Sequence, residues 1–201
     1  SPTQGEEATL DLAAEINALG LNAVPHLAAR LVRDRKHLVS LLDRMDGIGV
    51  RDVFVIAGDS TQPEGEFPDA LALLRAMTDI GRKPSRVGIT GYPETHSMIS
   101  DSATVQAMAA KAEFADYIVS QICYDPQKIA SWIKDVRARG IEQPVYIGSP
   151  GAVDPTKLLR ISLRIGLGES VRFLRKQHGV TKLLTRYTPE ELFHELSPYL
   201  V

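Results

Sequence analysis

The chain has 201 residues, of which 44% are hydrophobic and 24% are charged, with a formal net charge of −2. This composition is typical of a globular protein with enough apolar material for one sizeable core, and without a basic excess it argues against a nucleic-acid partner. No run approaches the ~18 apolar residues of a membrane span, and the polar start does not resemble a signal peptide. The single cysteine, Cys123, fits a reducing, cytoplasmic setting.

The first part of the chain predicts two helices and a strand between them. Residues 8–19 form an amphipathic helix that ends at Gly20, and its apolar residues are Leu10, Leu12, Ala13, Ile16 and Leu19. Residues 22–27 are a short buried strand that brings His26 to its far end. Asp34 then caps a helix that runs from Arg35 to about Met45.

Residues 52–57 (D-V-F-V-I-A) predict the next strand, and their nearly continuous apolar character indicates a strand that is covered on both faces. Gly58 and Asp59 follow at its carboxyl end, before a loop that contains proline and glycine. Residues 69–80 are helical and stop at Gly81.

Two runs rich in β-branched residues, 86–90 and 117–123, flank an alanine-rich helical segment that contains Lys111, which is typical of a β-α-β unit. Parallel α/β folds bind ligands at the carboxyl ends of their strands, and the first of these runs is followed there by Gly91, Tyr92, Glu94 and His96. Gln121 is expected inside the second strand, where a buried amide needs hydrogen-bond partners.

The last third begins with a helix from Pro126 to Arg139, because proline is tolerated in a first helical turn. Residues 145–148 are a fifth strand, and residues 156–201 are helical with turns at 166–168 and at Gly179. Strict alternation of strand and helix predicts a parallel sheet with right-handed crossovers. A closed barrel of this kind needs eight strands, so we expect one α/β domain of TIM type, (β/α)8, that lacks its first two strands and its last.

Three blocks of sequence resemble the methylenetetrahydrofolate reductases, which are β/α barrel enzymes that reduce a folate-bound methylene group to a methyl group. The blocks are G-Y-P-E-T-H at 91–96, K-A-E-F-A-D-Y-I-V-S-Q at 111–121 with the trailing Asp125, and A-G-D at 57–59. Together, in this order and each at a strand end, they extend the resemblance over nearly the whole chain.

The resemblance implies a role for seven residues. Asp59 matches an aspartate that lies near the cofactor ring and the folate, and Gln121 matches a glutamine that bonds the pterin ring, whose edge presents both donors and acceptors. His26 matches a position that lines the cofactor site in the family. The residues that match holders of the flavin's ribityl and phosphate portions are Tyr92, His96, Asp101 and Lys111. The family's general acid, a glutamate on the first strand, lies outside this sequence, and no metal is expected.

Plainer interpretations exist for the same residues. Asp59 can be an ordinary turn residue, His26 a hydrogen-bonded core histidine, and the amide of Gln121 can bond to neighbouring backbone. Tyr92 and His96 can be a packed aromatic residue and a polar residue at a helix start. Cys123 has no basic partner nearby in sequence, so we interpret it as a core residue and not as a nucleophile.

Two departures from the family pattern bear on the cofactor. Ala57 stands where many flavin-containing members have an arginine, which removes a bidentate anchor for an anionic cofactor. The loop at 149–152 lacks the aromatic that usually stacks on the folate. With the blocks at 25–30 and 168–176, the chain resembles the short actinobacterial reductases, some of which transfer hydride directly without flavin. This argues against FAD, although His96, Asp101 and Lys111 leave it open.

The sequence therefore predicts an enzyme of one-carbon and methionine metabolism that reduces methylenetetrahydrofolate with hydride from NADH or NADPH. Gln121 and Asp59 would position the pterin, and an anionic Asp59 would favour the cationic iminium form of the substrate. A folate-dependent methyltransferase and a non-catalytic folate-binding homologue are the alternatives. The expected partners are small molecules and neither nucleic acid nor a membrane. A homo-oligomer is also compatible with the sequence.

Overall fold

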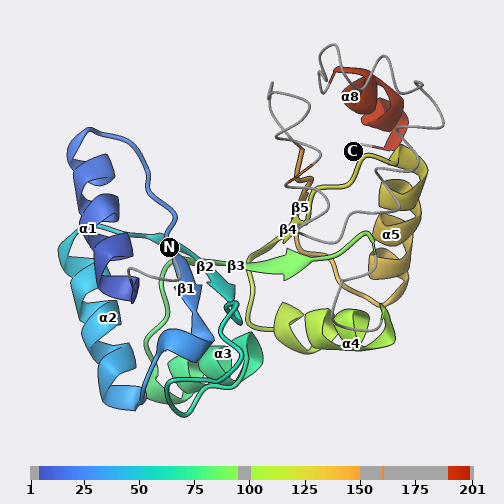
Figure 1. Cartoon of the computed structure of the whole chain (residues 1–201). Helices are drawn as coiled ribbons and strands as arrows, with labels where there is room; N and C mark the ends of the chain where they lie inside the picture. Colours follow the sequence, from blue (N-terminus) through green and yellow to red (C-terminus); the bar gives the residue numbers. More distant parts are fainter. Residues whose placement is uncertain (1–4, 95–100, 150–159, 161–189, 200–201) are drawn as a thin grey trace. The chain divides into compact units, whose positions relative to one another are not determined.

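The computed structural model describes residues 5–94, 101–149, 160 and 190–199, in which strands and helices alternate along the chain (Figure 1). Most of the helical residues predicted between 156 and 189 lie outside these ranges. The chain divides into two compact units, a first unit of Ser1–Thr90 with Ala110–Ile118 and a second unit of Gly91–Ala109 with Val119–Val201.

Five parallel strands form one sheet in the order β1-β2-β3-β4-β5, as predicted. They are β1 (His26–Ala28), β2 (Asp52–Ile56), β3 (Arg86–Gly91), β4 (Tyr117–Ser120) and β5 (Val145–Tyr146). His26 lies opposite Phe54, and Val53 lies opposite Val87. Each strand is added on the same side of the one before it, and the crossovers between parallel strands are right-handed. The connecting helices therefore lie on one face of the sheet, which is the topology of a TIM-type fold.

The helices follow the predicted segments closely. They are α1 (Gly5–Ala18), η1 (Ala29–Leu31), α2 (Arg35–Gly47), α3 (Ala70–Ile80), α4 (Asp101–Ala112), α5 (Pro126–Ala138), α8 (Glu190–Leu196) and η2 (Ser197–Tyr199). Aspartates cap three of them. Asp34 accepts a hydrogen bond from the N–H of His37 at 2.7 Å, and Asp69 accepts one from Ala72 at 2.9 Å. Asp125 accepts from both Gln127 and Lys128 at the start of α5.

The core of the first unit is built on β2, whose first four residues are all buried, as expected of a strand covered on both faces. Leu38 and Leu41 of α2 and Leu73 of α3 are completely buried. α1 lies beside α2 in Figure 1, and Arg44 of α2 forms ion pairs with two acidic side chains of α1, Glu7 and Asp11.

The buried face of α1 differs from the predicted one. Leu10 and Ala13 are buried, but Leu12 is 56% exposed and Leu19 is 78% exposed. Glu6 takes their place, because positions 6, 10 and 13 follow one another at the spacing of a helical face. A carboxylate therefore occupies the apolar stripe of this helix.

β1 begins at His26, four residues later than predicted. The N–H of Ala23 donates to Oδ1 of Asn17 at 2.9 Å, so this part of the segment is held by a side chain and not by a neighbouring strand. The ladder starts at Pro25, whose carbonyl accepts from the N–H of Phe54 at 3.0 Å. His26 is therefore at the amino end of β1, and the prediction that it lies at the far end is wrong.

A network of polar side chains connects the amino ends of β2, β3 and β4 in the first unit. The hydroxyl of Tyr117 donates to Oδ1 of Asp52 at 2.7 Å, and both side chains are buried. Arg86 lies 3.3 Å from the other oxygen of Asp52 and 4.8 Å from the centre of the Tyr117 ring. The ring covers Gly88, where a Cβ would lie 2.4 Å from ring carbons, so this position has no room for a side chain.

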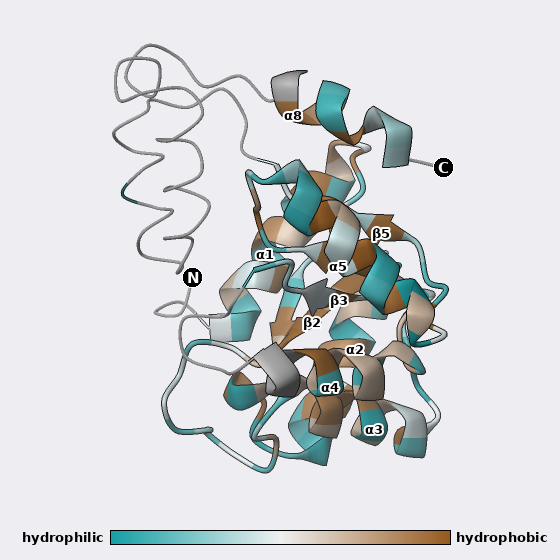
Figure 2. Ribbon diagram, turned by 90° about the vertical axis from the view of Figure 1, so that its right-hand side faces the viewer, coloured by the Kyte–Doolittle hydropathy of each residue, from teal (hydrophilic) through white to brown (hydrophobic). Residues whose placement is uncertain are grey.

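In the second unit, α5 and α8 pack on a small apolar cluster (Figure 2). Its buried members are Cys123, Ile129, Leu192 and Leu196. Cys123 is completely buried, and its thiol lies 3.4 Å from a carboxylate oxygen of Glu94. The prediction that Cys123 is a packed core residue is confirmed.

Candidate active site

The loop that follows β2 carries Gly58 and Asp59 at the carboxyl end of that strand. Gly58 has φ +90, a conformation that favours glycine, and a Cβ there would lie 3.1 Å from the Cβ of Ala28 in β1. Asp59 is exposed, and within the described residues its carboxylate makes no hydrogen bond or ion pair. The turn therefore presents an acceptor that remains available to a ligand.

Glu6 is a buried carboxylate at the same end of β1, and it was not among the predicted site residues. Its Oε1 accepts a hydrogen bond from the N–H of Ala28 at 2.7 Å, and the side chain is 7% exposed. Burial raises the pKa of Glu6, while the bond from Ala28 opposes this shift. The only signal for it in the sequence is its helical spacing from Leu10 and Ala13.

His26 packs its ring against Phe54, with 4.9 Å between the ring centroids. The partial removal of water from the imidazole lowers the pKa of His26, which favours its neutral form at pH 7. The ring lies level with the middle of β2 and is not at the carboxyl edge where ligands bind.

Lys111, near the end of α4, is 8% exposed, and its Nζ lies 3.4 Å from the hydroxyl oxygen of Thr90 in β3. Burial lowers the pKa of Lys111, and the negative charge of Asp69 partly offsets this effect. A buried ammonium group with one long hydrogen bond is poorly compensated. This environment suits an anionic ligand group near the carboxyl end of β3.

Gln121 directly follows β4 and does not lie inside it, because the strand ends at Ser120. Its side-chain Oε1 accepts from the N–H of Ile122 at 3.0 Å, and its own N–H donates to the carbonyl of Gly91 at 2.7 Å. Gln121 thus satisfies its amide oxygen locally, as the plainer interpretation allowed. Its Nε2 donates to none of the described residues, so the two donor hydrogens remain for a ligand.

The other predicted site residues are described only in part. Tyr92 comes directly after β3 and is half-buried. Asp101 begins α4, but its side chain lies outside what the structure describes, and so does the whole of His96. The hydrogen bond between Gln121 and Gly91 brings Gln121 beside the residue that precedes Tyr92.

The structure thus groups these residues locally within each unit. In the first unit, Glu6 and the Gly58 turn both contact Ala28, and Lys111 approaches Thr90. In the second unit, Gln121 and Tyr92 are neighbours through Gly91. We predicted that His26, Asp59, Tyr92, His96 and Gln121 converge on one cavity at the carboxyl ends of the strands. This stays a prediction for Asp59, Tyr92, His96 and Gln121, whereas His26 starts β1 at the opposite end.

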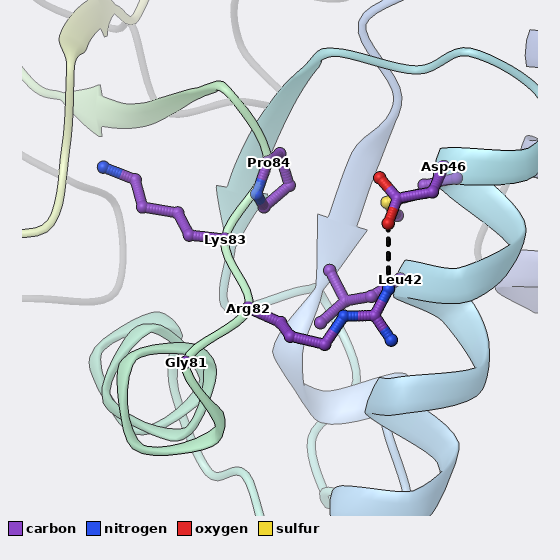
Figure 3. A pocket seen from close by; sticks show the side chains of 7 residues that line it. Leu42, Asp46, Gly81, Arg82, Lys83 and Pro84 are labelled. Atoms are coloured by element: carbon purple, nitrogen blue, oxygen red, sulfur yellow. Dashed lines mark hydrogen bonds and ion pairs between the residues drawn. The ribbon is translucent and has the colours of Figure 1, made fainter.

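A cavity of about 240 Å³ lies elsewhere, between the end of α2 and residues 81–84 (Figure 3). Arg82 extends into it and forms ion pairs with Asp43 and, at 2.8 Å, with Asp46, while Lys83 pairs with Asp116 at 3.0 Å. Its cations are already neutralised, and none of the predicted site residues lines it.

Comparison with known proteins identifies the family to which these blocks of sequence belong. The sequence model of the methylenetetrahydrofolate reductase family matches residues 2–150. The chain belongs to this family. Methylenetetrahydrofolate reductase 1 of Schizosaccharomyces pombe is 31% identical over 115 residues, which are 53% of this chain and 19% of the relative. Methylenetetrahydrofolate reductase 2 of Saccharomyces cerevisiae is 25% identical over 111 residues, 50% of this chain and 18% of the relative. The chain thus matches less than a fifth of the length of these reductases.

Among solved structures, oxaloacetate acetylhydrolase in complex with 3,3-difluorooxalacetate is similar in fold alone. The TM-score is 0.50 at 12% sequence identity, over 98% of this chain and 75% of the other. No described helix of this reductase-family chain is long and apolar enough to cross a bilayer. Its described residues also contain no group of three or more His, Cys, Asp or Glu side chains that could hold a metal ion.

Proposed function

We propose that the protein reduces methylenetetrahydrofolate to methyltetrahydrofolate with hydride from NADH or NADPH. The observation that carries the proposal is the Asp59 turn, in a chain of the methylenetetrahydrofolate reductase family. The carboxylate follows a buried strand, sits on a glycine turn that packs against β1, and has no partner within the described residues.

The reaction develops positive charge next to the pterin ring, and Asp59 supplies the opposite charge. Opening of the five-membered ring of the substrate, with protonation of its departing nitrogen, gives a cationic iminium. Hydride then adds to the methylene carbon, and NAD(P)+ is released. A carboxylate without a protein counter-ion stabilises such a cation more than one that is already paired. Gln121 complements it, because its Nε2 hydrogens can donate to acceptors on the pterin edge.

Lys111 supports the binding of a phosphate-bearing cofactor. The buried ammonium group has only the hydroxyl of Thr90 at 3.4 Å as a hydrogen-bond partner among the described residues, so an anionic group would compensate its charge. A dinucleotide provides such phosphates, and so does FAD, which when bound would pass hydride on in a separate step. Ala57 lacks the guanidinium that anchors flavin in many members. We therefore favour direct transfer from NADH or NADPH, with cytoplasmic one-carbon and methionine metabolism as its setting.

The test is an assay of NADH oxidation by the purified protein with methylenetetrahydrofolate and without added flavin. Added formaldehyde maintains the methylenetetrahydrofolate at equilibrium during the assay. We expect a colourless protein that turns over, with both substrates bound together before hydride passes. Replacement of Asp59 by Asn should lower kcat/KM about 10- to 100-fold, which corresponds to a loss of about 1.4–2.8 kcal/mol of electrostatic stabilisation of the cation.

Asp79→Asn is the matched control, since Asp79 is an exposed carboxylate of α3 that pairs with Arg35 at 2.8 Å. It should leave kcat/KM unchanged. Equal effects of the two substitutions would contradict the role of Asp59. A stoichiometric yellow chromophore, or activity only after flavin is added, would show the flavin-dependent mechanism. Folate binding without NADH oxidation would instead favour a non-catalytic homologue.

A further inference from the structure

The loop that carries Asp59 is long and contains neither helix nor strand from residue 57 to residue 69. Loops longer than about 12 residues without secondary structure are uncommon in compact domains unless they serve a function. Such a loop can present a side chain in one position only if something holds its backbone. Within the described residues, that role falls largely to Arg30 in η1.

Arg30 contacts the loop at four points. Its Nε donates to the carbonyl of Pro68 and its Nη1 donates to the carbonyl of Ser60, both at 2.8 Å. Its backbone N–H donates to Ala57 at 3.0 Å, and its carbonyl accepts from the N–H of Glu64 at 2.8 Å. The guanidinium group thus joins the residue after Asp59 to the residue before the cap of α3.

These contacts fix the backbone on both sides of Asp59. On one side, Gly58 packs against Ala28 in a left-handed conformation, and on the other the Ser60 carbonyl is held by Arg30. Gly65, farther along the loop, passes so close to the Arg33 carbonyl that a Cβ would lie 1.7 Å from its oxygen. The carboxylate of Asp59 itself makes no contact with the guanidinium among the described hydrogen bonds and ion pairs.

We infer that Arg30 is a positioning residue for the reductase reaction, which holds the Asp59 carboxylate in place by tying the two ends of its loop together. This inference rests on the proposed function. A lysine cannot replace it, because arginine donates from several nitrogens in a fixed fork, whereas lysine has one ammonium group and cannot reach two separate carbonyls in the same geometry.

The test is a double-mutant cycle with Arg30→Lys and Asp59→Asn, measured as kcat/KM for methylenetetrahydrofolate and as KM for NADH. We expect R30K alone to lower kcat/KM about tenfold, with the KM for NADH unchanged. In the D59N background the same change should have almost no further effect, because residues that act through one another are not additive. Arg35→Lys, at an exposed ion pair of the same unit, is the control.

Hydrogen exchange of the amides of Glu64 and Glu66 provides a second measurement, since Glu64 donates to the carbonyl of Arg30 in η1 and Glu66 donates to that of Arg33, just after η1. R30K should speed their exchange while amides of β2 stay protected. Wild-type kinetics in R30K alongside an impaired D59N protein would overturn the role of Arg30 and leave the proposed function intact. An equal loss of kcat/KM on R30K in the wild-type and D59N backgrounds would also overturn the role of Arg30, because it would indicate a general structural effect. An inactive wild-type protein would overturn the proposed function itself, and the inference with it.

Discussion

Removal of the Tyr117 hydroxyl should destabilise the protein without affecting its chemistry. Phenylalanine keeps the ring over Gly88 and the contact with Arg86, so the Tyr117→Phe variant isolates the 2.7 Å bond to Asp52. Hydrogen bonds to charged groups are worth roughly 1.5–3 kcal/mol, and the Asp52 oxygen left behind is buried. We therefore expect a loss of about 2 kcal/mol.

For a chain of this size, about 2 kcal/mol corresponds to a fall in Tm of roughly 4–8 °C. The assay is thermal unfolding by circular dichroism, with Tyr199→Phe as the control, because Tyr199 is 54% exposed. The network lies at the amino ends of the strands, where parallel folds do not place their chemistry. If the proposed activity holds, kcat should therefore not change. A Tm equal to that of the control, or a large fall in kcat with an unchanged Tm, would refute this reasoning.

The remaining predictions concern Glu6, Lys111 and Gly148. Because burial raises the pKa of Glu6, the folded protein loses stability as the pH rises from 4.5 through the folded pKa. The Glu6→Gln variant should therefore have a higher Tm than wild type at neutral pH, and this difference in Tm should shrink in acid. Glu6→Leu, which leaves the N–H of Ala28 without its acceptor, should cost about 1–3 kcal/mol. Because burial lowers the pKa of Lys111, Lys111→Met should raise the Tm of the ligand-free protein at neutral pH, and this gain should shrink as the pH approaches 10.5. The same variant should raise the KM for NADH about tenfold. A Tm below that of wild type would contradict this prediction. Gly148→Ala would place a Cβ 2.4 Å from the Ser120 carbonyl oxygen and should cost about 1–3 kcal/mol in chemical unfolding, whereas Gly47→Ala, with nothing within 4 Å, should cost little.

The elements of the fold were predictable because their signals are local. The caps at Asp34 and Asp125 bond to N–H groups two or three residues away, and the buried strand at 52–56 shows its character in five consecutive residues. The order of the strands followed from the alternation of strand and helix. Family membership was likewise predictable from short blocks at strand ends, and the comparisons confirm it.

The parts of the site that were missed depend on contacts that are distant in sequence. Glu6 meets Ala28 across 22 residues, and Arg30 meets Pro68 across 38. No periodicity encodes such pairs. The errors at strand ends have a different cause, since a side chain can replace a ladder bond. Asn17 does so for Ala23 before β1, and the amide of Gln121 bonds the N–H of Ile122 just after β4.

The aspartate caps of α2, α3 and α5 also restrict how this protein can hold a phosphate. The N-terminus of a helix is a common anion site, since its first N–H groups point outward and its dipole favours negative charge. At these three helices, which follow β1, β2 and β4, a carboxylate of the chain already occupies that position. A phosphate would have to displace a tethered anion of the same sign. At these three helix ends, the proposed recognition of a dinucleotide phosphate would therefore depend on side-chain cations. Among the described residues, Lys111 of α4 is a buried one.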